Sequence, residues 1–318
     1  RRGGCNETFQ TASEIGGRYE RAQRRGYSNP FSILIPCERT SMRRLCIHSI
    51  LAALFTLMTG SNQAADRNAW SRLRHPLPAQ PEVLGGYNAG CIRGAVDLPR
   101  VGRGYQVMRV SRHRYFGHPR LVDFVERFGR AVERQGLDPV LVGDLAQPRG
   151  GPMPFGHASH QSGLDVDIWF RTAPRQRHVS TSEIEELPMR SVIRVAEGRL
   201  DPEFWSERER RLLELAAQDP EVERIFVNPV IKLGLCHSEG KAAWLEKIRP
   251  WWGHDAHFHV RLACPPDSPR CDPQKPPPAG NGCDGDLEDW VNQIIALATE
   301  PPKPRPTQRP AAPSLPVA

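Results

Sequence analysis

Residues 156–170 read GHASHQSGLDVDIWF, and the second half of this stretch decides the fold. Apolar side chains alternate with other side chains along 164–170, as they do in a β-strand whose two faces differ. Asp165 and Asp167 therefore share the face opposite the apolar one. A charged group that enters a protein interior without a partner costs several kcal/mol. The two aspartates and the two histidines of this stretch must find partners among themselves, in water or in a metal ion.

A second stretch, WWGHDAHFHVRLAC at 251–264, shows the same alternation. It places His257 and His259 on one side of a predicted strand. If the two strands are neighbours in one sheet, His160, Asp167 and His259 can converge on a point. Two imidazoles and one carboxylate are the ligand set of an open catalytic zinc site, which leaves a fourth position for water.

Single histidines in proteins are mostly structural or exposed, so the spacing between His160 and Asp167 carries little weight alone. The concentration of histidines in two short stretches is stronger evidence for a metal site. The two stretches hold five of the eleven histidines, namely His157, His160, His254, His257 and His259. We therefore interpret the two stretches as one metal site.

The rest of the chain mixes short strands and helices without regular alternation. Helical spacing of apolar residues predicts helices at 121–136, 206–218 and 241–252, the last ended by Pro250. Short apolar runs predict strands at 104–111, 139–146 and 222–228. We expect an α+β fold, in which helices flank a central, mainly antiparallel sheet that carries the zinc site. The expected single domain covers 66–299, with its core at about 85–295.

The two ends of the chain have other compositions. Residues 1–41 are arginine-rich and contain no methionine, and we interpret them as a non-native upstream extension, with a genuine N-terminal extension as the alternative. Residues 42–65 have a basic start, an apolar run too short to span a bilayer, and small residues before a cut near Ala65, as in a signal peptide. Residues 300–318 are proline-rich and predict a disordered tail.

The net charge of +7 is concentrated in this leader. Residues 1–41 hold seven arginines and four glutamates, and residues 42–65 hold two arginines and no acid, which leaves +2 for 66–318. A charge this small, without a basic and aromatic stripe, predicts no nucleic-acid partner. After cleavage at Ala65 we also expect no stable membrane insertion.

Five cysteines follow the leader, and an exported protein keeps disulfides. Cys264 and Cys271 flank a turn-rich loop, so we predict that they pair, and that Cys236 pairs with Cys283. Cys91 is then left without a partner. None of the spacings matches a CxxC zinc site, which favours a structural role.

The chain resembles the penicillin-insensitive murein endopeptidases, within the wider group of zinc peptidases related to lysostaphin, D-alanyl-D-alanine peptidases and the hedgehog fold. The resemblance runs from about 84 to 290. It is carried by SRHRYFGHP (111–119), GDLAQPRGGPMPFGHASHQSGLDVDIWF (143–170), RIFVNPVIK (224–232) and WWGHDAHFHVRLAC (251–264).

This resemblance implies a role for each histidine of the two stretches. The implied zinc ligands are His160, Asp167 and His259, with His157 at a further position at the metal. His257 takes the place of the catalytic histidine, and His254 that of a neighbouring active-site histidine. The resemblance also implies a cysteine near the C-terminus as the partner of Cys91, and the sequence has none after Cys283, which leaves a free thiol or an intermolecular link as the alternatives for Cys91.

The implied activity is hydrolysis of the D-alanyl to meso-diaminopimelyl cross-link of peptidoglycan by a D,D-endopeptidase in the periplasm. Zinc would polarise the scissile carbonyl and lower the pKa of a bound water toward about 7. His257 is placed either to take the proton of that water or, when protonated, to stabilise the oxyanion. A water nucleophile leaves no serine for penicillin to acylate.

Two other functions fit the same residues. One is a D,D- or L,D-carboxypeptidase with the same metal site, and the other is a non-catalytic wall-binding module with structural zinc. The presence of His257 argues against the second. Asp165 fits equally a carboxylate that holds a ligand imidazole and a plain structural one. The sequence leaves open the oligomeric state and a second metal.

Overall fold

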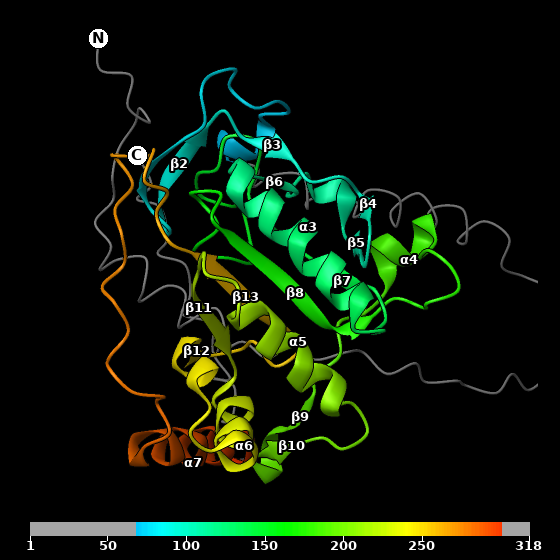
Figure 1. Cartoon of the computed structure of the whole chain (residues 1–318), viewed down its shortest axis with the longest axis vertical. Helices are drawn as coiled ribbons and strands as arrows, with labels where there is room; N and C mark the ends of the chain where they lie inside the picture. The colour runs from blue at the N-terminus through cyan, green and yellow to red at the C-terminus, as the bar shows by residue number, and fades with distance from the viewer. Residues whose placement is uncertain (1–67, 301–318) are drawn as a thin grey trace, which may run out of the picture.

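The structure, a computed structural model, describes residues 68–300 and is built around one seven-stranded sheet (Figure 1). The strands follow the order β12-β11-β13-β8-β7-β5-β4. They are β4 (Val101–Gly102), β5 (Tyr105–Val107), β7 (Val140–Val142), β8 (Asp165–Thr172), β11 (Val222–Val227), β12 (Ile248–Pro250) and β13 (His257–Leu262). Only the β5–β7 and β11–β12 pairs are parallel. The prediction of an α+β fold with a mainly antiparallel central sheet is confirmed.

The two stretches that decided the prediction form the middle of this sheet. β8 and β13 are antiparallel neighbours. The alternation is as predicted, because Val166, Ile168, Phe258 and Val260 are completely buried on one face. That face forms the main hydrophobic core.

Two helices cover this apolar face. They are α3 (Pro119–Arg134) and α5 (Glu207–Ala217), which match the predictions at 121–136 and 206–218. α3 starts with a proline after the N-cap His118, and α5 starts with a capping box between Ser206 and Glu209. The ring of Phe128 on α3 meets the ring of Phe258 on β13 edge-on, with centroids 6.4 Å apart.

The remaining elements lie around the edges of the sheet (Figure 1). Three two-stranded ladders pair β1 (Glu82–Gly86) with β2 (Ala89–Arg93), β3 (Val96–Asp97) with β6 (Phe116–Gly117), and β9 (Ile193–Arg194) with β10 (Arg199–Leu200). The other helices are α4 (Thr181–Glu186), α6 (Pro229–Glu239) and α7 (Gly285–Thr299), and α6 packs against α7, β10 and β12. Short 3-10 turns are η1 (Trp70–Arg72), η2 (Val110–Arg112), η3 (Val195–Glu197) and η4 (Ala243–Lys247).

The predicted helix at 241–252 is wrong beyond its first half. The chain forms η4 and then the strand β12, which pairs with β11. Pro250 lies in this strand because β12 is at the edge of the sheet, where a missing N–H breaks no ladder. The predictions at 1–41 and 42–65, and the tail beyond Glu300, lie outside the described residues.

The observed disulfides confirm two of the cysteine predictions and contradict the third. Cys264 pairs with Cys271, and Cys236 pairs with Cys283, as predicted. Cys91 is also disulfide-bonded, so the expectation that it has no partner is wrong. The Cys236–Cys283 bond links α6 to the segment that precedes α7.

Candidate active site

The register between β8 and β13 brings the polar faces of both strands together. His259 lies opposite Asp167, and Arg261 lies opposite Asp165. This is the neighbourhood that the sequence required for a metal site. It lies on the face of the sheet opposite the main core.

The other two predicted residues come from the loop before β8. The backbone of His160 is left-handed, with φ 65°, a conformation that residues other than glycine seldom adopt. Two contacts hold it there, since its backbone N–H donates to Asp165 Oδ2 at 3.0 Å and its Nδ1 lies 2.8 Å from the carbonyl oxygen of Leu145. The loop thereby places His157 beside His160, with ring centroids 4.4 Å apart.

Asp167 is the centre of the cluster, and its two oxygens face different histidines. Oδ1 lies 3.3 Å from His160 Nε2 and 3.2 Å from His259 Nδ1. Oδ2 lies 3.5 Å from His157 Nδ1 and 3.6 Å from His257 Nε2. The structure thus brings together all four residues expected at the metal, and His257 with them.

His254, the remaining predicted residue, joins the cluster from the loop before β13. Its ring centroid lies 5.0 Å from that of His257 and 5.7 Å from that of His259. Its backbone is also left-handed, with φ 54°. Its Nδ1 lies 2.7 Å from the carbonyl oxygen of Trp252, which leaves Nε2 available.

Hydrogen bonds on the outer side of the rings determine which nitrogen carries a proton. A carbonyl oxygen only accepts, so His160 is protonated on Nδ1 and its Nε2 presents a lone pair toward Asp167. The Nε2 of His157 lies 2.9 Å from Asp144 Oδ2, an acceptor that leaves Nδ1 for the centre. Within residues 68–300, His257 makes no side-chain hydrogen bond.

Ionised carboxylates surround this cluster. Burial alone would raise the pKa of Asp144, but the hydrogen bond from His157 and the charges of Arg114 and Arg112 hold that pKa well below its ordinary value. Burial is likewise outweighed at Asp165, whose pKa is lowered by Arg261 and His259.

The pKa of Asp167 is lowered against the effect of burial by His257, His160 and His157. Burial lowers the pKa of His160 and His257, and it lowers the pKa of His254 still further. These imidazoles are therefore neutral at pH 7, the form that can ligate a metal or accept a proton. The pKa of His259 is raised despite burial, because Asp165 and Asp167 both face this ring.

Orphaned atoms in the cluster fit a metal ion. His160 Nε2 and Asp167 Oδ1 are buried without a hydrogen bond, although such atoms are normally paired. His157, His160 and Asp167 offer ligand atoms within 4.8 Å of one another. Zinc bonds of about 2.0–2.1 Å at tetrahedral angles put ligand atoms about 3.3 Å apart. The separations of 3.3 Å and 3.2 Å around Asp167 Oδ1 match this spacing.

Asp144 is the main residue that the sequence did not single out. It is buried, and its Oδ2 lies 2.8 Å from Arg114 Nη1, 3.2 Å from Arg112 Nη1 and 2.9 Å from His157 Nε2. Its sequence signal was an acid two residues after the apolar run 139–142, within one of the family segments. It orients His157 from outside the cluster.

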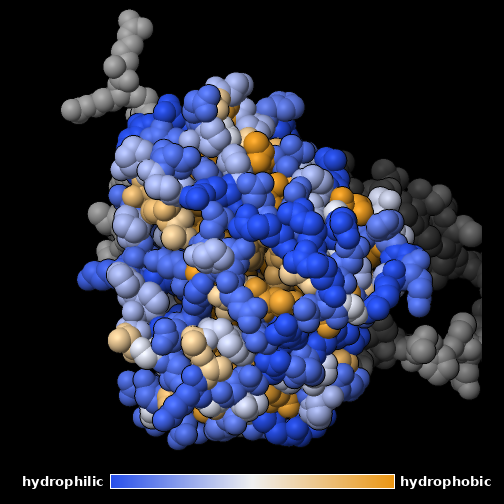
Figure 2. Space-filling model, viewed as in Figure 1, coloured by the Kyte–Doolittle hydropathy of each residue, from blue (hydrophilic) through white to orange (hydrophobic). Residues whose placement is uncertain are grey.

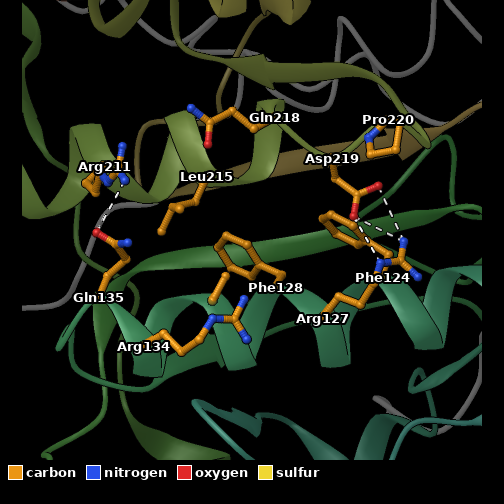
Figure 3. Close-up of a pocket in the computed structure, with 11 residues that line it drawn as sticks. Phe124, Arg127, Phe128, Arg134, Gln135, Arg211, Leu215, Gln218, Asp219 and Pro220 are labelled. Carbon is orange, nitrogen blue, oxygen red and sulfur yellow. Dashed lines mark hydrogen bonds and ion pairs between the residues drawn. The ribbon is translucent and has the colours of Figure 1, made fainter.

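A pocket of the described residues lies on the other side of the sheet. It has a volume of about 540 Å³ between α3 and α5, and its walls include Phe128, Leu215 and Arg134 (Figure 3). Figure 2 shows this side of the molecule, where apolar residues are visible in a hollow near the centre. Because Phe128 packs on Phe258, whose side chain points away from His257 and His259, the pocket is remote from the histidines.

The fold and the geometry of the histidine cluster indicate the class of protein. Four imidazoles, two from β13 and two from the loop before β8, surround a buried carboxylate, an arrangement typical of a metal-dependent hydrolase. The residues described here contain no helix with the length and apolar character needed to cross a membrane.

Comparison with known proteins identifies the family. Residues 83–317 match the family described as penicillin-insensitive murein endopeptidase. Relatives with that name include one from Haemophilus influenzae, 44% identical over 255 residues that cover 79% of this chain and 86% of the relative. Another from Yersinia enterocolitica is 47% identical over 223 residues (70% and 80%), and one from Klebsiella pneumoniae is 42% identical over 259 residues (81% and 90%). The chain belongs to the penicillin-insensitive murein endopeptidase family and is a peptide hydrolase.

Proposed function

We propose that the protein is a zinc-dependent D,D-endopeptidase that hydrolyses D-alanyl to meso-diaminopimelyl cross-links of periplasmic peptidoglycan. The observation that carries the proposal is the spacing of 3.2–3.3 Å between Asp167 Oδ1 and one nitrogen each of His160 and His259. The substrate is supported by relatives named murein endopeptidases. In this proposal residues 42–65 direct export, and residues 66–299 form the enzyme.

The proposed ligands are His160 through Nε2, Asp167 through Oδ1 and His259 through Nδ1. His157 is a further ligand of the same centre, through the Nδ1 that faces Asp167 Oδ2. Neutral imidazoles and an ionised carboxylate are the ligand forms that zinc requires. When bound, zinc supplies a Lewis acid that polarises the scissile carbonyl and makes a water acidic enough to ionise near pH 7.

His257 is the proposed general base. Its Nε2 lies 3.6 Å from Asp167 Oδ2, on the side of the carboxylate away from His160 and His259. No acceptor fixes the proton on either nitrogen among the described residues, so the ring is free to take a proton from the attacking water and return it to the leaving amine. His254, neutral and with Nε2 unengaged, is the proposed partner that orients the substrate or shares this proton.

The test uses the full chain, purified with its disulfides formed, and a cross-linked disaccharide-tetrapeptide dimer in the presence of penicillin. We expect conversion of the dimer to monomers. The reaction should stop with a chelator and return with zinc. His257→Ala should lower kcat by about 10²–10⁴-fold with little change in zinc content.

The matched control is His178→Ala, which removes an exposed histidine outside the cluster and should keep full activity. If the dimer survives while a pentapeptide monomer loses its last alanine, the enzyme is a carboxypeptidase and the proposed substrate is wrong. If zinc binds and neither substrate changes, the non-catalytic wall-binding module replaces the enzyme.

A further inference from the structure

We propose that Asp165 and Arg261 act as a positioning pair that fixes His160 and His259 in the orientation and protonation that bind the metal. The inference rests on the proposed function, because it concerns two of its zinc ligands. Neither Asp165 nor Arg261 faces the centre, so both act through other residues.

Asp165 is completely buried, and donors reach both of its oxygens. Arg261 donates through Nε to Oδ1 at 2.7 Å and through Nη2 to Oδ2 at 3.1 Å. The backbone N–H of His160 donates to Oδ2 at 3.0 Å, and His259 Nε2 lies 3.0 Å from Oδ1. Four donors therefore face two oxygens, and a carboxylate offers about four lone pairs and no proton.

This arrangement controls two ligands at once. The hydrogen bond to Oδ2 helps to hold the left-handed backbone of His160, which carries Nε2 toward Asp167. The contact at Oδ1 is at ion-pair distance but is not an aligned hydrogen bond, and Asp165 is the acceptor within reach of His259 Nε2. A proton held on Nε2 leaves the lone pair of His259 on Nδ1, which faces Asp167.

Arg261 is itself held on three sides. Its guanidinium lies over the ring of Tyr87, 4.1 Å from the centroid, and 5.1 Å from the ring centroid of Phe226. Its Nη1 donates to Gln274 Oε1 at 2.6 Å. Tyr87 is fixed in turn by a hydrogen bond from its hydroxyl to the carbonyl oxygen of Leu262. A planar fork between two rings keeps Asp165 in one orientation, which a lysine could not do.

The charge and shape of Asp165 are both needed in this account. An asparagine has one acceptor oxygen and one NH₂ group. Whichever way the amide turns, its NH₂ faces two donors, either Arg261 with His259 or Arg261 with the backbone of His160. Asp165→Asn therefore either releases the backbone of His160 or moves the proton of His259 to Nδ1.

The experiment measures the zinc dissociation constant of the full chain by competition with a chelating dye, and the visible absorption of the Co²⁺-loaded protein. We expect Asp165→Asn to raise the dissociation constant by about 10–100-fold and to change the Co²⁺ spectrum. Arg261→Lys should also raise the dissociation constant and change the spectrum, because lysine keeps the positive charge but cannot make the two hydrogen bonds of the guanidinium to Asp165. Glu209→Gln is the matched control, since Glu209 is a completely buried carboxylate paired with Arg208 on α5, and it should bind zinc as the wild type does.

Zinc affinity and a Co²⁺ spectrum equal to wild type in both variants would overturn the positioning role. A second measurement needs no variant, because nitrogen NMR of the zinc-loaded wild type reports which nitrogen of each histidine carries the proton. We expect a proton on His259 Nε2, and a proton on Nδ1 would contradict the proposal. A wild type that binds no zinc would overturn both the proposed function and this inference, whereas zinc binding that is equal in wild type and variants would overturn this inference alone.

Discussion

Asp144 and Arg114 form a buried ion pair, with 2.8 Å between Oδ2 of the carboxylate and Nη1 of the guanidinium, and both side chains are only 3% exposed. The same oxygen faces His157 Nε2. Arg114 also donates to the carbonyl oxygen of Phe155, in the loop that carries His157. One buried pair thus fixes the loop and one histidine of the centre.

Asp144→Asn should therefore destabilise the protein strongly. The substitution leaves the guanidinium of Arg114 buried without a countercharge, which costs about 3–5 kcal/mol. Urea unfolding in the presence of a chelator measures this loss without a contribution from metal. The control is Asp138→Asn, which removes a partly exposed pair with Arg175 and should cost about 0–1 kcal/mol. Equal losses in the two variants would contradict the role of Asp144.

Gly150 tests the close packing under the histidine loop. Its φ is 67°, and a Cβ at this position would lie 1.9 Å from the carbonyl oxygen of Gln161, the residue after His160. Gly150→Ala should unfold the protein more readily and weaken zinc binding, because the loop must move. Gly136→Ala is a matched control, since φ is 68° and nothing lies within 4 Å of the added carbon.

The control should cost only the left-handed strain of about 1–2 kcal/mol and should bind zinc normally. Thermal unfolding and dye competition measure both properties. A Gly150→Ala protein that matches Gly136→Ala in both would show that the loop does not depend on this contact.

Lys232 predicts a pH dependence of stability. It is completely buried on α6, and its Nζ donates to the carbonyl oxygens of Leu245 and Asn281. Burial lowers its pKa to about 7, whereas an unfolded lysine keeps its ordinary pKa of 10.5. Between these values the unfolded chain binds one more proton, so stability rises with pH.

The expected slope from this residue is about 1.4 kcal/mol per pH unit between pH 7.5 and 10. Below pH 7 the lysine is charged in both states and its contribution no longer changes. Lys232→Met removes the titration, and the difference between the unfolding free energies of wild type and variant isolates it. Parallel pH curves for the two proteins would contradict the lowered pKa.

The two disulfides whose cysteines both lie in the described residues should contribute unequally. Cys236–Cys283 spans 47 residues and Cys264–Cys271 spans 7. Loop-closure entropy predicts a loss of about 4 kcal/mol for the first and about 2 kcal/mol for the second when both cysteines become alanine. Denaturant unfolding of the two double variants checks the order, and a larger loss for the short loop would contradict it.

The sequence predicted β8 and α3 because their apolar side chains repeat with a single period over many residues. The sequence did not predict that the polar faces of β8 and β13 lie side by side, and the metal site was expected only if they do. The pairing of His259 with Asp167 meets that condition. The prediction of a helix at 241–252 was wrong in its second half. The apolar residues of this segment have helical spacing, but Pro250 lies in an edge strand. Tertiary pairing with β11 outweighed the local preference.

The surroundings of the centre were harder to predict for a physical reason. The donors around Asp144 come from two other segments, 112–114 and the loop that holds His157, so no local spacing records them. The left-handed backbone of His160 is imposed by Asp165 and Leu145 and leaves no mark in a pattern of apolar residues. Asp165 was read either as a structural carboxylate or as one that holds a ligand, and its contacts with Arg261 and His259 support both uses.

The register between β8 and β13 also links metal competence to folding. A slip of β13 by one residue against β8 would turn Val260 toward the polar face and His259 into the core, and a slip of β8 would do the same to Val166 and Asp167. Misaligned chains therefore lose the hydrophobic interior and the histidine cluster together. During refolding, the amide protons of these two strands should become protected in the same kinetic phase in which the molecules gain the ability to bind metal. Only chains with the correct strand register can therefore become active enzyme.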